Sequence, residues 1–322
     1  MHLSSAAKIA DKAFMATLTK PECLLCATHE VSPYQEENGH DYVKCQSCGF
    51  VYLHPRPSEE ELHDIYQEEE GATFHHGAEI AASYEKRLEA RLRWRVVQSG
   101  LDVPLRKALE VGCGAGYFLE LLEASGWQGK GCELAQSYVD FARNRLKLDV
   151  TKDIKECSGP YGAIFLFNVL SHYSDPERDI RDLRDRLVEG GVLVMETGNV
   201  AEVSPDKVGH LGAPDHVYHF SEENIRALLL RCGFREVTVY RRNVEWQRKF
   251  LGFNPKKGPE GHHHHGHSHG HAHETVDPAK KPLWKRVARS FFSHLLLALR
   301  FRFGKIFADR DHFCTLFVIA RR

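Results

Sequence analysis

The sequence feature that most constrains the fold is an alternation of strand and helix patterns around a glycine-rich stretch, LEVGCGAGYF at residues 109–118. From residue 105 onward, near-continuous apolar segments alternate with amphipathic ones, and one predicted helix runs from Asp175-Pro176 to the glycine pair at 190–191. Apolar strands of this kind form parallel sheets that are covered by helices on both faces. The pattern predicts an α/β protein whose ligand binds at the carboxyl ends of the strands.

The spacing of the glycines indicates which kind of ligand the loop binds. Gly112, Gly114 and Gly116 follow G-x-G-x-G, whereas the dinucleotide fingerprint is G-x-G-x-x-G. A pyrophosphate would use the positive end of the following helix, but Glu110, two residues before the first glycine, would repel phosphate. The same carboxylate can pair with an ammonium group. These residues favour a ligand with an amino acid portion and a nucleoside without phosphate, S-adenosyl-L-methionine (SAM).

Four of the nine cysteines form two C-x-x-C pairs near the amino terminus. Cys23 and Cys26 are separated by 18 residues from Cys45 and Cys48. Each pair fits a tight turn, and two such turns supply four thiolates to a tetrahedral zinc ion at a spacing typical of zinc ribbons. Four thiolates leave no open coordination position, so we expect a structural rather than a catalytic zinc.

Several motifs together resemble the class I SAM-dependent methyltransferases. LEVGCGAGYF is similar to motif I of that superfamily, and it occurs with the cysteine pairs, the P-x-P that follows them, SHYSDP, and DHVYHFSEENIRALLLRCGF. Within the superfamily the chain resembles members with an amino-terminal zinc ribbon, among them the deoxysugar C-methyltransferases. The resemblance implies a Rossmann-like, seven-stranded sheet with helices on both faces.

The resemblance also implies roles for individual residues in SAM binding. Glu110 and the glycine loop would face the methionine portion, with Asn168 beneath it, and Cys113 in the loop is expected to be a small filler. Glu133, at the end of the second strand, would accept both ribose hydroxyls. Asp153 and Ile154, after the third strand, would flank the adenine.

Two histidines stand where a catalytic base is expected. His172 lies just past the fourth strand, and we predict that it either has a catalytic or substrate-orienting role or holds its loop. In the sugar C-methyltransferases an acid–histidine pair at the position of Asp215 and His216 belongs to the catalytic centre. A tyrosine usually stands shortly before that pair, and Ala213 replaces it here, which weakens the prediction of C-methylation. The alternative is that His216 and His219 merely shape the lip of the site.

The chain is predicted to divide into five parts. In order they are an extension (1–20), a zinc ribbon (21–57), a helical connector (58–104), a methyltransferase domain (105–242 and 309–322) and an insertion (243–308). The connector contains a capping box at Ser58-Glu61 and an arginine-rich helix at 78–99, whose arginines are predicted to be solvated. The insertion contains a His-rich linker (261–274) and a basic amphipathic helix (283–307). That helix is predicted to contact a membrane surface, with a sheet cap or substrate lid as the alternative.

Composition limits the classes of function. The formal net charge is −1, so no global field favours nucleic acid, and the first residues lack the apolar core of a secretory signal. We therefore expect a cytoplasmic enzyme, peripheral at the inner face of the membrane. The predicted activity is methyl transfer to a small molecule or saccharide, with O-methylation favoured and C-methylation open. The alternatives are an RNA methyltransferase that binds nucleic acid through the ribbon, and a non-catalytic interaction protein.

Overall fold

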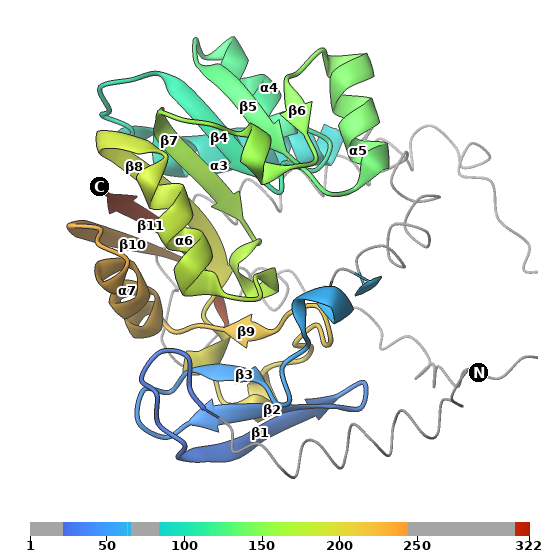
Figure 1. The fold of residues 1–322 in the computed structure, drawn as a ribbon, viewed down its shortest axis with the longest axis vertical. Coiled ribbons are helices and arrows are strands. Elements are labelled where there is room, and N and C mark those ends of the chain that lie inside the picture. Colours follow the sequence, from blue (N-terminus) through green and yellow to red (C-terminus); the bar gives the residue numbers. More distant parts are fainter. Residues whose placement is uncertain (1–21, 63, 66–83, 244–312) are drawn as a thin grey trace, which may run out of the picture.

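The structure is a computed structural model that describes residues 22–62, 64–65, 84–243 and 313–322 (Figure 1). The predicted extension at 1–20, the His-rich linker at 261–274 and the basic helix at 283–307 lie outside the described residues.

A seven-stranded sheet forms the centre of the main domain, as predicted. Its order is β10-β11-β8-β7-β4-β5-β6, and β11 alone runs antiparallel to the other six strands. The strands are β4 (Lys107–Val111), β5 (Gln128–Cys132), β6 (Val150–Thr151), β7 (Tyr161–Phe167), β8 (Leu187–Gly198), β10 (Glu236–Asn243) and β11 (Cys314–Arg321). The last two strands pair as an antiparallel hairpin, and the insertion lies in the chain between their paired ends, Asn243 and Cys314.

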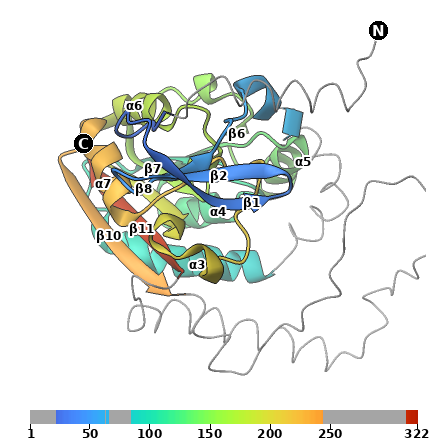
Figure 2. The ribbon, with the colours of Figure 1, turned by 90° about the horizontal axis from the view of Figure 1, so that it is seen from below.

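Helices cover both faces of this sheet (Figures 1 and 2). α3 (Tyr84–Val97), α4 (Tyr117–Ala124) and α5 (Gln136–Phe141) pack on one face, and α6 (Pro176–Asp185) and α7 (Glu222–Arg231) pack on the other. Successive residues of β4 serve the two faces: Ala108 joins the first core, and Leu109 and Val111 join the second. Among the described residues, no helix is long and apolar enough to cross a bilayer.

Short helical turns connect these elements. They are η1 (Gln98–Gly100), η2 (Ala142–Leu146), η3 (Ile154–Glu156), η4 (Leu170–His172), η5 (Val200–Glu202) and η6 (Pro205–Lys207). The predicted capping box is confirmed, since Ser58 and Glu61 form a reciprocal cap, and the Ser221 side chain caps α7.

The predicted helix after Asp175 is shorter than expected. Asp175 caps α6 by accepting a hydrogen bond from the Arg178 N–H at 3.0 Å, but the helix ends at Asp185 rather than at the glycine pair. Leu187 already pairs with Tyr161 of β7, and its side chain is buried, so the sheet captures the last residues of the helical pattern. Tertiary pairing outweighed local helical propensity here.

The amino-terminal region forms a second sheet of four strands. β1 (Val31–Glu37), β2 (His40–Cys45) and β3 (Val51–Leu53) are joined by β9 (Tyr218–His219), which belongs to the main domain by sequence. Phe50 packs its ring 5.7 Å from Tyr218 and 5.1 Å from Phe220. The amino-terminal sheet, called the ribbon below, is therefore extended by a strand from a loop of the main domain, as Figure 1 shows for β3 and β9.

Candidate functional site

The glycine loop between β4 and α4 has the open backbone that its sequence predicts. Gly112, Gly114 and Gly116 have φ angles of 69°, 52° and 83°, in the left-handed region that glycine adopts freely. A Cβ on Gly112 would lie 2.5 Å from Val169, and one on Gly116 would lie 2.7 Å from Leu148. A Cβ on Gly114 would meet no atom within 4 Å. Packing thus requires two of the glycines, and the third faces open space that a ligand can enter.

Glu133 lies directly beside this loop. Its carboxylate accepts hydrogen bonds from the backbone N–H groups of Gly114, at 2.8 Å, and Ala135, at 3.0 Å. Leu134 follows it and is 51% exposed, and Leu230 is the other exposed large apolar residue in the described part of the chain. Sequence analysis did not single out Leu134. Its position directly after Glu133, the acid at the end of the strand, could have indicated it.

Glu110 is the most perturbed acid at the site. It is 4% exposed, and its Oε2 atom has no hydrogen-bond partner among the described residues. Burial raises the pKa of its carboxyl to about 8, while Arg93 opposes the shift and Glu133 adds to it. A buried oxygen without a donor is suited to an incoming cation, so the residue fits the ammonium group of SAM.

Arg93 is a site residue that sequence analysis missed. Its guanidinium contacts Glu196 of β8 at 2.6 Å and Glu89 at 3.1 Å, and it lies 4.8 Å from the centre of the Phe167 ring. Its side chain is 16% exposed, so the prediction that the arginines of this helix are solvated is wrong at this position. Its positive charge acts on Glu110 and favours the ionised form of that carboxyl.

The remaining predicted SAM residues lie around the same edge of the sheet. Cys113 is buried against β5, 2.8 Å from where a Cβ on Gly131 would stand, and burial raises the pKa of its thiol well above the usual range. This burial fits the expected filler role. Asn168 ends β7 in a left-handed conformation, with φ 58°. Asp153 and Ile154 begin η3 after β6, and no hydrogen bond among the described residues joins them to the glycine loop.

The two predicted catalytic segments meet in space. His172 comes from the turn after β7, and Asp215 and His216 come from the loop after β8, 43 residues later. His172 Nδ1 lies 3.1 Å from the Asp215 carbonyl oxygen and 3.7 Å from Asp215 Oδ2. His216 Nε2 lies 3.7 Å from the same carboxylate oxygen, and the two imidazole rings are 4.4 Å apart at 87°.

The environments of the histidines differ. Burial lowers the pKa of His172 to about 4, and the backbone carbonyls of Asp215 and Asn168 both contact its ring. Burial also lowers the pKa of His216, but its side chain is 39% exposed. His219 is buried, its pKa falls to about 3, and its Nε2 lacks a partner within the described part of the chain. All three rings are neutral at pH 7, and His216 combines neutrality with access to solvent.

Gly212 makes room for the His216 ring. A Cβ at this position would lie 2.9 Å from His216 Cγ, and the residue has φ 89°. Sequence analysis did not single it out.

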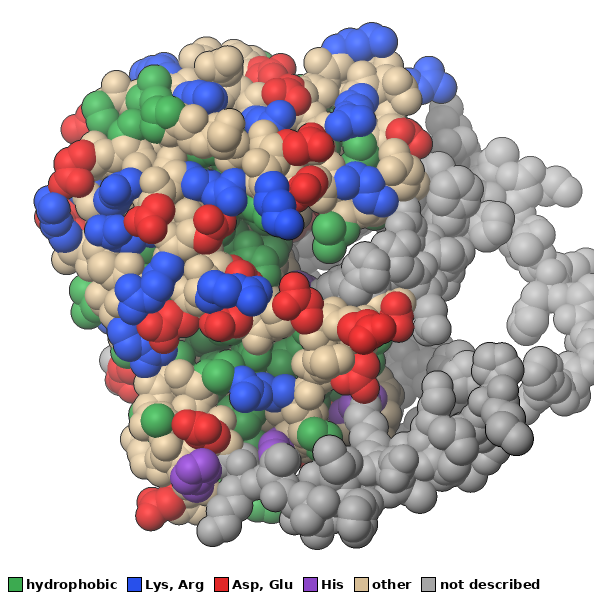
Figure 3. Space-filling view, viewed as in Figure 1, with side chains coloured by type: hydrophobic (Ala, Val, Ile, Leu, Met, Phe, Trp, Pro, Cys, Tyr) green, Lys and Arg blue, Asp and Glu red, His purple; other side chains and the backbone are tan. Residues whose placement is uncertain are grey.

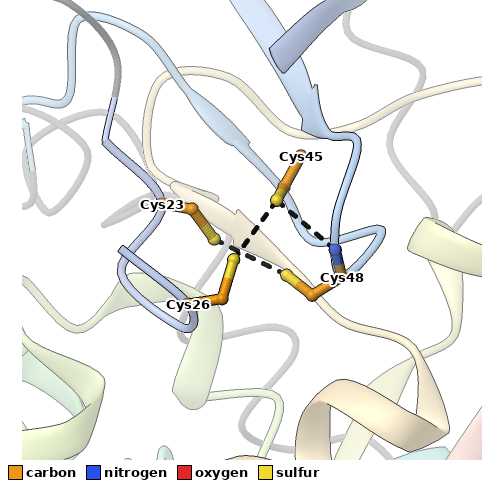
Figure 4. Close-up of side chains that lie close together, drawn as sticks. All are labelled: Cys23, Cys26, Cys45 and Cys48. Carbon is orange, nitrogen blue, oxygen red and sulfur yellow. Dashed lines mark hydrogen bonds between the residues drawn. The ribbon is translucent and has the colours of Figure 1, made fainter. Parts of the chain in front are cut away.

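The four amino-terminal cysteines converge, as predicted (Figure 4). Cys23 Sγ lies 3.6 Å from Cys48 Sγ, and Cys26 Sγ lies 3.5 Å from Cys45 Sγ. A tetrahedral ion with Zn–S bonds of about 2.3 Å separates its sulfur ligands by about 3.8 Å. The donor set and its spacing therefore fit a structural zinc ion.

Comparison with known proteins agrees with this fold. Residues 81–239 match the methyltransferase domain family. A probable S-adenosylmethionine-dependent methyltransferase of Mycobacterium tuberculosis is 26% identical over 139 residues, which are 42% of this chain and 50% of that protein. A ubiquinone biosynthesis O-methyltransferase of Xanthomonas oryzae is 30% identical over 118 residues, 34% of this chain and 49% of that protein. A tRNA U34 carboxymethyltransferase of Dichelobacter nodosus is 34% identical over 113 residues, 32% of this chain and 36% of that protein.

The sheet order, the glycine loop and these matches support a class I SAM-dependent methyltransferase fold for the main domain. The chain spans half or less of the length of each of these relatives.

Proposed function

We propose that this protein is a SAM-dependent methyltransferase that methylates a hydroxyl of a small molecule or saccharide. The observation that carries the proposal is that two sites adjoin: the glycine loop with its acids, and the group of His172, Asp215 and His216. Gly114, with Glu110 and Glu133 around it, opens onto a ligand space, and Val169 packs on the same loop at Gly112. Asn168, next to Val169, contacts His172, which adjoins Asp215 and His216.

In this proposal the loop and its acids hold the cofactor. Glu133 would accept the ribose hydroxyls, the unpartnered oxygen of Glu110 would pair with the ammonium group, and Leu134 would cover an apolar face of the adenine together with Ile154. Asp153 would add a hydrogen bond to the adenine. When bound, SAM supplies an electrophilic methyl group on a sulfonium centre.

His216 is the proposed general base. A hydroxyl must lose its proton as it attacks a methyl group, and a neutral imidazole near the operating pH accepts that proton efficiently. The Asp215 carboxylate, 3.7 Å away, would stabilise the imidazolium that forms. We assign His172 to holding the loop, because two backbone carbonyls already contact its ring.

Oxygen is the favoured acceptor atom for two reasons. Ala213 stands where the resembling sugar C-methyltransferases carry a tyrosine, and one relative is named for O-methylation. The resemblance to the deoxysugar enzymes, which rests on the cysteine pairs and the DHVYHF segment, supports a saccharide as one acceptor class.

RNA is the second candidate acceptor, because one relative is named for a tRNA reaction. Figure 3 shows acidic and basic side chains intermixed over the α6 and α7 face, where Arg181 and Arg231 both pair with Glu177. Paired arginines on this face do not make the basic stripe that phosphate binding needs.

Calorimetry with SAM tests the cofactor assignment. We expect Glu133→Ala to weaken binding by at least about tenfold, since it removes charge-assisted hydrogen bonds. Glu236→Ala, an exposed acid on β10, is the matched control and should bind like wild type. Absence of binding by the wild type, or equal affinity of the Glu133→Ala variant, would refute the assignment.

Transfer from SAM with a labelled methyl group to fractionated cell extract tests the acceptor class. Label that enters the small-molecule or glycan fraction and disappears with His216→Ala supports the proposal. Label in the RNA fraction would favour the second candidate instead.

A further inference from the structure

The tip of the β1–β2 hairpin holds the loop that carries Asp215 and His216. Glu37, the last residue of β1, accepts hydrogen bonds from three successive backbone N–H groups: Leu211 at 2.7 Å, Gly212 at 2.7 Å and Ala213 at 3.0 Å. Its side chain is 12% exposed. Burial alone would raise the pKa of Glu37, but the three backbone donors outweigh it and lower the pKa. The group therefore stays a carboxylate inside this nest of amides.

The carbonyl groups of the same loop are held from the ribbon as well. The Tyr42 hydroxyl, on β2, donates to the His216 carbonyl oxygen at 2.7 Å, and the Asn38 side chain donates to the Ala213 carbonyl oxygen at 2.9 Å. The Leu53 N–H donates to the Val217 carbonyl oxygen at 2.9 Å. The ribbon thus contacts this loop near both of its ends, and it supplies both hydrogen-bond acceptors and hydrogen-bond donors.

Among the described residues, the main domain makes fewer hydrogen bonds to the backbone of the same stretch. The Val217 N–H donates to the Ser171 carbonyl oxygen at 2.8 Å, and the Asp215 carbonyl oxygen lies 3.1 Å from His172 Nδ1. The main domain also contributes packing, because the side chains of Leu211 and Val217 are buried in the core. The backbone of 211–217 therefore takes most of its hydrogen bonds to other elements from the ribbon.

We propose that the ribbon is a positioning element of the active site, in which Glu37 and Tyr42 fix the loop that carries His216. The cysteine cluster acts at the opposite end of the same hairpin. Cys45 ends β2, where it pairs with Val31, while Glu37 pairs with His40 at the tip. Cys23, Cys26, Cys45 and Cys48 would hold a metal ion that fixes the base of the hairpin, and the tip of the hairpin holds the loop. The catalytic role of His216 rests on the proposed function, but the structural coupling does not.

Hydrogen–deuterium exchange of the full chain tests this coupling without an acceptor. We expect Glu37→Ala to speed exchange in peptides covering 209–219 by about tenfold or more, because three amides lose their acceptor. Tyr42→Phe, which removes one hydroxyl and keeps the ring, should speed exchange around His216 to a lesser extent. Peptides of the glycine loop at 107–118 should not change, and the affinity for SAM should stay within about twofold of wild type.

The control is Glu30→Ala, an exposed acid of the same ribbon, which should leave all these peptides unchanged. Zinc content equal to wild type identifies variants whose ribbon is still folded. Removal of zinc from the wild type should also speed exchange at 209–219. Unchanged exchange at 209–219 in Glu37→Ala, in Tyr42→Phe and in zinc-free protein would overturn the proposal. A wild-type protein that fails to bind SAM would refute the proposed function and leave this result intact.

Discussion

The buried carboxyl of Glu110 makes SAM binding dependent on pH. It lies on β4 with a pKa of about 8, and its charged neighbours are Arg93 and Glu133. The Leu119 backbone N–H of α4 contacts it and favours the ionised form. An ammonium group attracts the carboxylate rather than the carboxylic acid, so binding should release the proton that Glu110 carries at neutral pH.

The size of the effect follows from the pKa. At pH 7 a group with a pKa of about 8 is about nine-tenths protonated, so binding should release about 0.9 proton. Because the protonated fraction grows as the pH falls, the Kd should weaken by about tenfold from pH 7 to pH 6, or about 1.4 kcal/mol.

The raised pKa of Glu110 also affects the stability of the protein without bound SAM. The pKa of Glu110 is higher in the folded than in the unfolded chain, where it is 4.5. The folded state therefore binds this proton more tightly, and the contribution of Glu110 to stability falls as the pH rises from 4.5 towards 8.

Calorimetry at pH 6–7.5, in buffers of different ionisation enthalpy, measures both the Kd and the protons released. In this range the α-amino group of SAM, with a pKa of about 7.7–8.0, stays mostly protonated. Glu110→Gln should bind more weakly at pH 7.5, release no proton and show little dependence on pH. Glu236→Gln should behave like wild type. A wild type whose Kd is constant between pH 6 and 7.5, or a Glu110→Gln variant that releases as many protons, would refute the reasoning.

Three further predictions concern other parts of the chain. Cys45→Ser should reduce bound zinc from about one ion per chain to a small fraction, measured by elemental analysis, whereas Cys314→Ser should keep it; a full complement in Cys45→Ser would mean that the site is misassigned. Gly212→Ala should lower the free energy of unfolding in urea by about 1–3 kcal/mol, because a Cβ is strained at φ 89° and meets the His216 ring. Gly209→Ala, where a Cβ meets no atom within 4 Å, should change it little, and equal unfolding midpoints for the two variants would contradict the prediction. Deletion of residues 280–308 should abolish flotation of the protein with anionic liposomes, and undiminished flotation would remove the proposed membrane role of that segment.

Much of the fold follows from local patterns. The G-x-G-x-G spacing predicted a strand, a tight turn and a helix, and the backbone has left-handed φ at all three glycines. The two C-x-x-C pairs predicted converging thiols, and the four sulfur atoms meet. Local patterns were less reliable where a neighbouring strand competed: the helix predicted up to the glycine pair yields at Leu187, because β7 pairs with that residue.

The candidate site could be predicted in its parts but not in its connections. Glu110, Glu133, His172 and His216 stand out because polar residues that follow apolar strands reach the ligand-binding edge of a parallel sheet. Their spacing in the sequence does not reveal that His172 contacts Asp215, 43 residues away. Those roles in SAM binding and catalysis stay predictions.

The sequence by itself determined the elements that depend on neighbours along the chain: the glycine turn, the helix caps and the cysteine turns. Only the tertiary structure decided which side chains are buried together. It brought the charge of Arg93 to act on Glu110, and it set the Glu37 carboxylate of the ribbon against the loop of His216. The physical reason is that φ and ψ preferences and short spacings act over a few residues. Burial and long-range hydrogen bonds depend instead on which faces of the helices and sheets pack together, and this packing depends on residues far apart in the sequence.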